Sequence, residues 1–154
     1  MLHFNQYVHE GEQFFREVAR ETNTPWDSIR AFRLTRAVLH TLRNRLPTAT
    51  SLHLISQLPM LIKAVYVDGW KITDDYKFIR NVGDFIEAIR EEGGVSLMSD
   101  FVSDTEVIQA VQAVFIVLKK HVSEGEIEDV LATLPKVLRS VITGEDEFTQ
   151  RGTA

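Results

Sequence analysis

The stretch AVLHTLRNRLPTATSLHLISQLPMLIKAV, residues 37–65, decides the fold, because the chain repeats it as AVFIVLKKHVSEGEIEDVLATLPKVLRSV at residues 113–141. The offset is 76 residues at every position, and six positions are identical. A shorter match, FREVARE at 15–21 with FIEAIRE at 85–91, extends both copies upstream. A unit with one apolar face cannot bury that face alone, whereas two stacked units bury both. The sequence therefore predicts two tandem repeats around one core.

The apolar residues of both copies recur at the helical period. A helix over residues 24–45 is predicted, with Thr24 as its N-cap and Pro25 at its first position. The stretches Ser103–Glu106 and Ser123–Glu126 match capping boxes, in which the Ser and Glu side chains satisfy each other's free backbone N–H groups. No stretch alternates polar and apolar residues between turn signals. The predicted fold class is therefore all-α, without a sheet. Five positions of the long helix are expected to face inward: Leu34, Val38, Leu39, Leu42 and Leu46.

A Leu-Pro dipeptide falls inside the third helix of each repeat, at Leu58-Pro59 and Leu134-Pro135. A proline inside a helix removes one hydrogen bond and clashes with the preceding turn, which costs about 3 kcal/mol. The third helix of each repeat is thus predicted to be kinked or broken there. We favour a break into two short helices that wrap the long central one.

The domain organisation follows from these elements. Residues 1–142 are predicted to form a single helical domain, with the two repeats at about 10–67 and 81–142 and an inter-repeat linker at 68–80. The polar end of the chain, residues 143–154, contains two glycines and is predicted to be a disordered tail.

The composition excludes several classes of chemistry. The 154 residues include no cysteine, which rules out disulfides, Cys-ligated metal sites and thiol catalysis. The N-terminus lacks the pattern of a secretory signal, and the longest apolar run, residues 113–118, is far shorter than the ~20 residues of a spanning helix. We therefore expect a cytoplasmic protein. The net charge of −5 is unevenly divided, with +1 in residues 1–76 and −6 in residues 77–154.

Two runs resemble a known bacterial family. They are LRNRLPTATSLHLISQLPMLIKAVYVDGW at 42–70 and HVSEGEIEDVLATLPKVLRSVI at 121–142, and the family is that of domain of unknown function 2267. The resemblance covers roughly residues 10–142, whereas the first ten residues and the chain after Ile142 depart from the pattern. The resemblance implies an all-helical fold. It supplies no catalytic residue to carry over.

One basic stripe lies on the long helix. Arg33, Arg36, His40 and Arg43 are spaced by three, four and three residues, opposite the apolar stripe. Such a face could bind phosphate, nucleic acid or an acidic partner. It could equally be a solvated face, or pair with the acidic residues at 124–129.

Aromatic residues gather where the first repeat ends. Tyr66 and Trp70, with Tyr76 nearby, could anchor a binding partner. They could also cover the end of the helical core, which is the interpretation we favour. With the basic stripe, Tyr66 and Trp70 complete the candidate binding surface.

No pattern in the chain indicates catalysis. The five histidines form neither HExxH nor HxxxH, and no P-loop, GxGxxG or GxSxG occurs. We accordingly assign no catalytic residue, no metal ligand and no cofactor, and an enzyme is a minor alternative.

Four hypotheses for function remain. The leading one is a non-catalytic helical module that binds a protein partner or a second copy of itself. The second is a regulatory domain that binds a small molecule or anion between the repeats, through the basic stripe. The third is the enzyme alternative. The fourth, nucleic-acid binding, is disfavoured by the acidic net charge. A membrane role is not expected.

Overall fold

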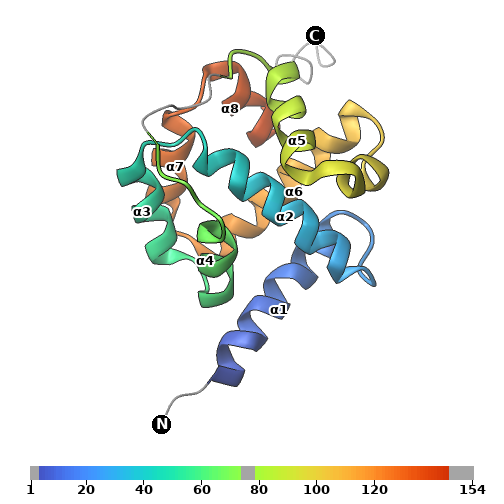
Figure 1. The fold of residues 1–154 in the computed structure, drawn as a ribbon, viewed down its shortest axis with the longest axis vertical. Coiled ribbons are helices and arrows are strands. Elements are labelled where there is room, and N and C mark those ends of the chain that lie inside the picture. The colour runs from blue at the N-terminus through green and yellow to red at the C-terminus, as the bar shows by residue number, and fades with distance from the viewer. Residues whose placement is uncertain (1–3, 74–78, 146–154) are drawn as a thin grey trace.

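The computed structural model describes residues 4–73 and 79–145, and within these ranges the chain forms α-helices and no β-strand (Figure 1). The prediction of an all-α fold is confirmed. The eight helices of the described residues are α1 (Phe4–Glu21), α2 (Ser28–Arg43), α3 (Thr48–Gln57), α4 (Met60–Val67), α5 (Val82–Asp100), α6 (Asp104–His121), α7 (Glu124–Ala132) and α8 (Lys136–Thr143).

The helix starts follow the register of the sequence repeat. Helices α2, α3 and α4 begin at residues 28, 48 and 60, and α6, α7 and α8 begin 76 residues later, at 104, 124 and 136. That the two units are equivalent stays a prediction. Superposing residues 15–65 on residues 85–141 would test it directly.

Each Leu-Pro dipeptide lies between two short helices. Helix α3 ends at Gln57 and α4 begins at Met60, with Leu58 in an extended conformation and Pro59 as the N-cap of α4. A residue before proline is driven out of the helical region by the proline ring, which explains why the helix stops there. Pro135 is likewise the N-cap of α8.

The start of α2 differs from the prediction. The N-cap is Asp27, whose carboxylate accepts a hydrogen bond from the backbone N–H of Arg30 at 3.0 Å. Thr24 instead belongs to the end of α1, since its N–H donates to the carbonyl of Ala19 at 2.9 Å. Asn23 makes this closure possible by adopting a left-handed φ of 62°.

The capping boxes of α6 and α7 form only in part. Each Ser hydroxyl accepts from a Glu backbone N–H, as predicted, at 3.1 Å for Glu106 and 3.3 Å for Glu126. The return bonds are absent, because the Glu106 carboxylate accepts from Val102 and the Ser123 N–H donates to Gln57 instead. The latter bond ties α7 to the end of α3.

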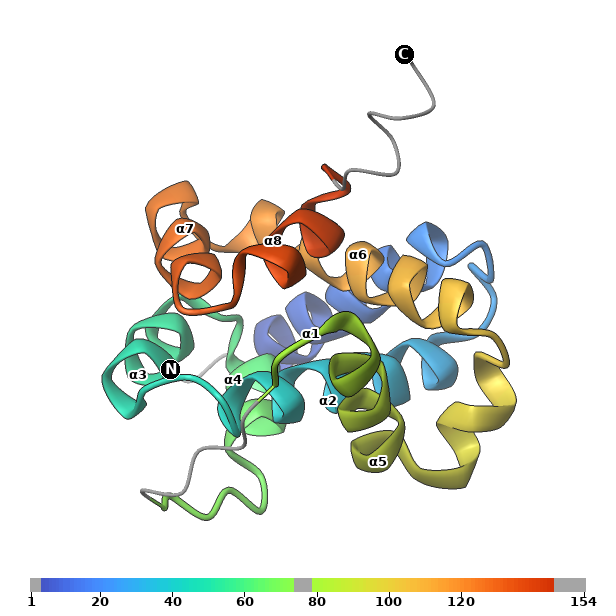
Figure 2. The ribbon, with the colours of Figure 1, turned by 90° about the horizontal axis from the view of Figure 1, so that it is seen from above.

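The core is one continuous cluster to which all eight helices contribute. Helix α1 lies between α6 on one side and α2 and α4 on the other (Figure 2). Helix α5 packs mainly against α2, so the two halves of the chain interlock. All five positions predicted to face inward from the long helix are buried: Leu34, Val38, Leu39, Leu42 and Leu46.

Helix α5 bends at Gly94, in the stretch that the first copy lacks. Its φ of 66° and ψ of −161° are accessible to glycine and interrupt the helix. Residues 95–100 therefore turn away from the first part of α5 and lead into α6. Among the described residues, no single helix is long and apolar enough to cross a membrane. Only α5 and α6 together, bent by 109°, meet such a criterion.

The contact between α1 and α4 depends on Gly11. A Cβ at this position would come within 2.6 Å of Leu61 Cδ1 and 2.9 Å of Leu61 Cβ. We expect Gly11→Ala to lower the free energy of unfolding by about 1–3 kcal/mol, although alanine is the better helix former. Urea denaturation measures the change.

The matched control is Gly125→Ala in α7, where a Cβ would meet nothing within 4 Å. It should leave stability unchanged or raise it by up to about 1 kcal/mol. Equal stability of the two variants would show that α1 and α4 are not closely packed at Gly11.

Candidate protein-interaction surface

The first member of the basic stripe, Arg33, is held inside the molecule's own structure. Its Nε and Nη2 donate to the two carboxylate oxygens of Asp100 at 2.8 and 3.0 Å. This hydrogen bonding raises the pKa of Arg33 above its ordinary value. Because Asp100 is the last residue of α5, the pair fastens the bent end of α5 to α2. The alternative of pairing with residues 124–129 is thus wrong for Arg33.

Arg30 reinforces the same junction. Its guanidinium lies 4.0 Å from the centre of the Phe101 ring and donates to the Asp100 carbonyl at 3.0 Å. Its other amino group donates to the Thr24 hydroxyl at 2.9 Å. One arginine therefore joins the α1–α2 turn, α2 and the end of α5, which gives this corner a fixed shape.

His40 and Arg43 cap the end of α4. The last carbonyl groups of a helix have no partner within it, and here side chains of α2 supply the donors. His40 Nε2 donates to the Val65 carbonyl, and Arg43 Nη1 donates to the carbonyls of Tyr66 and Asp68, each at 2.7 Å. His40 is buried, which lowers its pKa by desolvation, and the nearby arginines lower the pKa further.

The four stripe residues consequently do not form one open site. Arg33 and Arg43 donate hydrogen bonds to groups within the protein, and His40 is buried under α4. Arg36 is exposed and makes no hydrogen bond or ion pair with any described residue. Only Arg36 remains fully available to a partner.

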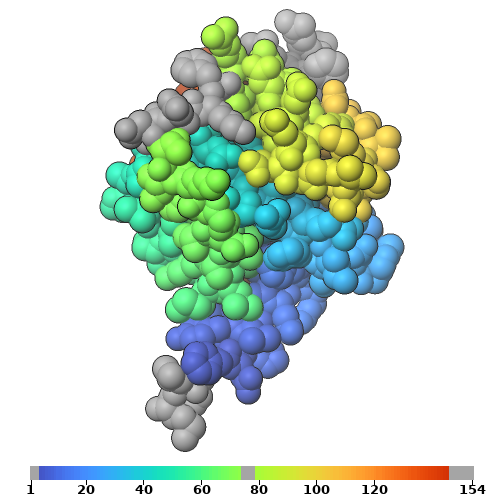
Figure 3. Space-filling model, viewed as in Figure 1, coloured from blue at the N-terminus to red at the C-terminus, as the bar shows by residue number. Residues whose placement is uncertain are grey.

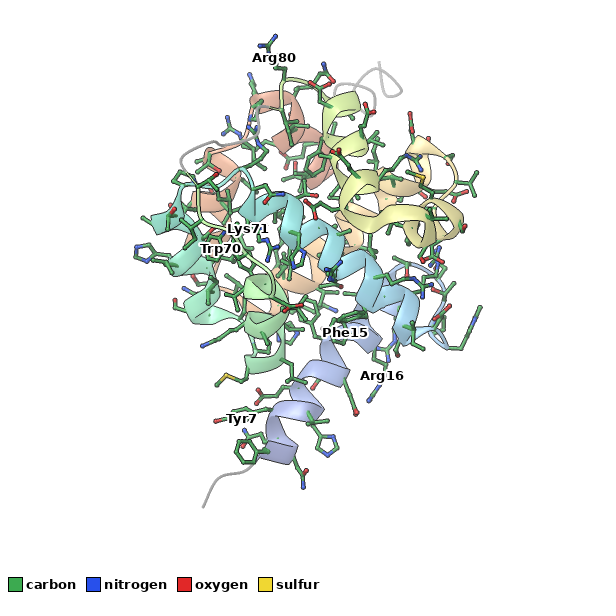
Figure 4. All side chains as sticks on the ribbon, viewed as in Figure 1. Tyr7, Phe15, Arg16, Trp70, Lys71 and Arg80 are labelled. Carbon is green, nitrogen blue, oxygen red and sulfur yellow. The ribbon has the colours of Figure 1, made fainter. Side chains whose placement is uncertain are left out.

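The predicted aromatic residues contribute to the core. Tyr66 is 0% exposed and shares a 2.6 Å hydrogen bond with the Ser51 hydroxyl, and burial raises its pKa to about 12. Trp70 is half-buried and meets the Tyr66 ring edge-on at 5.8 Å (Figure 4). Tyr66 therefore cannot anchor a partner, because the fold covers it. Tyr76 lies outside the described residues, as do most residues of the predicted tail.

An exposed apolar set that the sequence analysis did not single out lies at the start of α2. Trp26 is 79% exposed, Ile29 69% and Phe32 39%. Ile29 and Phe32, three residues apart, lie on one side of α2 off the buried stripe, and Trp26 lies in the turn just before the N-cap of α2. The spacing of these apolar residues is the sequence signal for this surface. From the sequence, we interpret the segment only as a helix start with Thr24 as its N-cap.

Aromatic and cationic residues surround this set. Phe15 of α1 meets Phe32 edge-on, with ring centres 5.5 Å apart, so the apolar area spans α1 and α2. Arg16 follows Phe15 on α1 and is exposed, as Figure 4 shows, and Arg36 lies one turn beyond Phe32. We call these six residues the aromatic–arginine surface: Phe15, Arg16, Trp26, Ile29, Phe32 and Arg36.

A separate groove of about 510 Å³ opens between α1, the α3–α4 junction and the end of α6. Tyr7, Met60, Lys63 and His121 are among its lining residues. At its edge His121 Nε2 lies 3.2 Å from a Glu17 carboxylate oxygen, which ties α6 to α1. In the part of the chain that the structure describes, no three His, Asp or Glu side chains are placed to hold a metal ion.

The described residues thus form an all-helical fold with an exposed apolar face around Trp26, Ile29 and Phe32. The sequence model of the family described as "Uncharacterized conserved protein (DUF2267)" matches residues 11–141. The chain belongs to this family, as the resemblance of its Leu-Pro runs predicted. No curated protein matches the chain.

The buried His40 predicts a pH dependence of stability. Its pKa in the fold is below the ordinary value of 6.5, so the unfolded chain takes up this proton first as the pH falls. Stability is therefore highest above pH 6.5 and declines below it, by up to about 1.4 kcal/mol per pH unit for this one proton.

His40→Gln keeps an N–H donor for the Val65 carbonyl but does not titrate. Its free energy of unfolding, measured by urea denaturation from pH 7.5 to about pH 5, should fall less steeply than that of the wild type. His53→Gln changes an exposed histidine of α3 and should follow the wild type. Parallel curves for wild type and His40→Gln would contradict the assignment.

Proposed function

We propose that this protein is a non-catalytic interaction module that binds a protein partner through the aromatic–arginine surface. One observation carries the proposal, namely that Trp26, just before α2, and Ile29 and Phe32, in its first turns, are all exposed, whereas the opposite face of α2 is buried. Isolated apolar side chains at a surface are common, whereas a contiguous aromatic patch is typical of a binding site.

The composition of the surface supports this function. Trp, Phe and Arg are enriched at the centres of protein interfaces, and they dominate binding energy where they occur. Charged residues that are already paired contribute little to a new partner, but Arg36 is unengaged and Arg16 has only a 3.9 Å exposed contact with Glu12. The two arginines favour a partner with acidic groups around an apolar centre.

The backbone beneath the surface is held in place before any partner arrives. The Arg33–Asp100 pair and the Arg30–Phe101 contact fix α2 against α5, and Phe15 against Phe32 fixes α1 against α2. A preformed surface avoids the entropic cost of ordering loops on binding. These contacts favour placing the partner on α1, α2 and the turn that joins them.

A second candidate is the binding of a small molecule in the groove between α1, α4 and α6. Its volume of about 510 Å³ lies within the range of ligand pockets, and Lys63 and His121 offer polar contacts. The anion site first expected on the basic stripe has less support, because three of its four members are engaged within the protein.

Site-specific cross-linking tests the interaction surface. A photo-reactive amino acid in place of Ile29 should give a discrete cross-linked product in the source organism. The same group in place of Leu52, which is 57% exposed on α3, is the control and should give none. A Trp26→Ala change in the Ile29 cross-linking variant should reduce the product several-fold, since exposed aromatic anchors carry binding energy.

Both positions are exposed, so neither change should alter the circular dichroism spectrum or the thermal midpoint. The proposal fails if position 29 gives no product, or if positions 29 and 52 give the same products.

A further inference from the structure

A second groove lies at the bend of α5, on the other half of the chain. It encloses about 440 Å³ between the first part of α5, its bent end and the start of α6. Met98, which is 47% exposed, supplies the open apolar contact above the buried Ile86, and Glu87, Glu91 and Asp104 supply carboxylates. We call these five residues the acidic groove. All three carboxylate residues are exposed, so the groove is open to a partner.

The one basic residue in the groove is already satisfied. Arg90 donates to Asp104 at 3.1 Å and to the carbonyls of Phe101 and Val102 at 3.1 and 3.2 Å. Glu87, in contrast, makes no hydrogen bond or ion pair with a described residue. The groove therefore presents a net negative charge beside the exposed side chain of Met98.

The aromatic–arginine surface and the acidic groove are complementary in charge, and each has exposed apolar side chains. One is a set of exposed apolar side chains at the start of α2 and in the turn before it, with arginines beside it. The other is a groove with carboxylates beside the exposed side chain of Met98. Opposite charge around matched apolar centres favours association and fixes its register.

The two surfaces also lie next to each other on one molecule. Helices α2 and α5 pack against each other and both reach the face shown in Figure 3, and the Arg33–Asp100 pair joins them. When complementary surfaces are adjacent, a twofold axis between two copies forms the same contact twice. The first surface of each copy meets the second surface of the other. Such a contact closes on itself and does not grow into a filament.

We infer that the occupant of the aromatic–arginine surface is a second copy of this chain, which docks it into the acidic groove to form a twofold dimer. Ile29 and Phe32 pack against Met98 across the interface, and Arg36 faces Glu87. The inference rests on the proposed function and names the partner that the surface binds.

The other acidic region of the chain fits this role less well. The start of α7 carries Glu124, Glu128 and Asp129 at exposed positions. No large apolar side chain of α7 is exposed, however, so nothing there would cover Ile29 or Trp26. Charge alone between solvated groups contributes little to affinity. The groove at the α5 bend combines carboxylates with the exposed side chain of Met98.

Sedimentation velocity of the full chain, at protein concentrations from about 1 μM to about 1 mM, tests the dimer. A dimer whose dissociation constant lies between these concentrations converts from monomer to dimer within the range. The wild type should convert from monomer to dimer within that range. Added salt should weaken the dimer, because part of the attraction is between exposed charges.

Charge reversal identifies the surfaces. Arg36→Glu, Glu87→Arg and Ile29→Glu should each weaken the dimer at least about tenfold, because each places a charge against like charge or against apolar groups. The double variant Arg36→Glu with Glu87→Arg should recover most of the wild-type affinity. Arg139→Glu, at an exposed position of α8, is the matched control and should leave the affinity unchanged.

Four outcomes overturn the inference. They are a monomer at every concentration, a dimer that resists all three single changes, a double variant as weak as the single ones, and a control that weakens the dimer equally. A monomer whose position 29 still cross-links to another protein refutes self-association and leaves the proposed function standing. A monomer with no cross-link at that position refutes both.

Discussion

The carbonyl groups at the end of α4 impose the constraint on which much of the structure depends. Pro59 is the N-cap of α4, which has only eight residues and ends at Val67. Its last carbonyls face the side of α2. Two of them, those of Val65 and Tyr66, and the carbonyl of the C-cap Asp68 receive hydrogen bonds from His40 and Arg43, more than twenty residues away in the chain. A helix end buried without donors would cost several unsatisfied groups, so half of the basic stripe serves the fold.

The second unit meets the same requirement with different residues. Val141 is the counterpart of Val65 in the repeat, and its carbonyl accepts from the Gln112 side chain at 2.8 Å. The residue aligned with His40 is Ile116, which cannot donate and is exposed. Gln112 aligns with Arg36 and takes over the donor role from one turn earlier along α6. In the first unit His40 already fills that role, which leaves Arg36 free at the surface.

How far the sequence predicts this structure depends on whether a feature is local. The buried stripe of α2 and the break before Pro59 follow from periodicity and from proline sterics, and both are present. The cap of α2 was misplaced because Asn23 adopts a left-handed conformation and gives Thr24 to α1. The basic stripe was expected to form one surface, but periodicity identifies a polar face without showing which later helix covers it. Here α4 covers His40 and the end of α5 engages Arg33.

The proposed duplication, followed by divergence, would account for the two unlike surfaces. Trp26 and Val102 are aligned in the repeat, and both stand exposed just before the N-cap of a long helix. Around Trp26 the first unit has arginines, and near Val102 the second has carboxylates, in keeping with the charges of +1 and −6 in the two halves. Two copies of one scaffold with like charge would repel each other. In the proposed dimer, opposite charge on equivalent corners would instead attract a second copy of the chain.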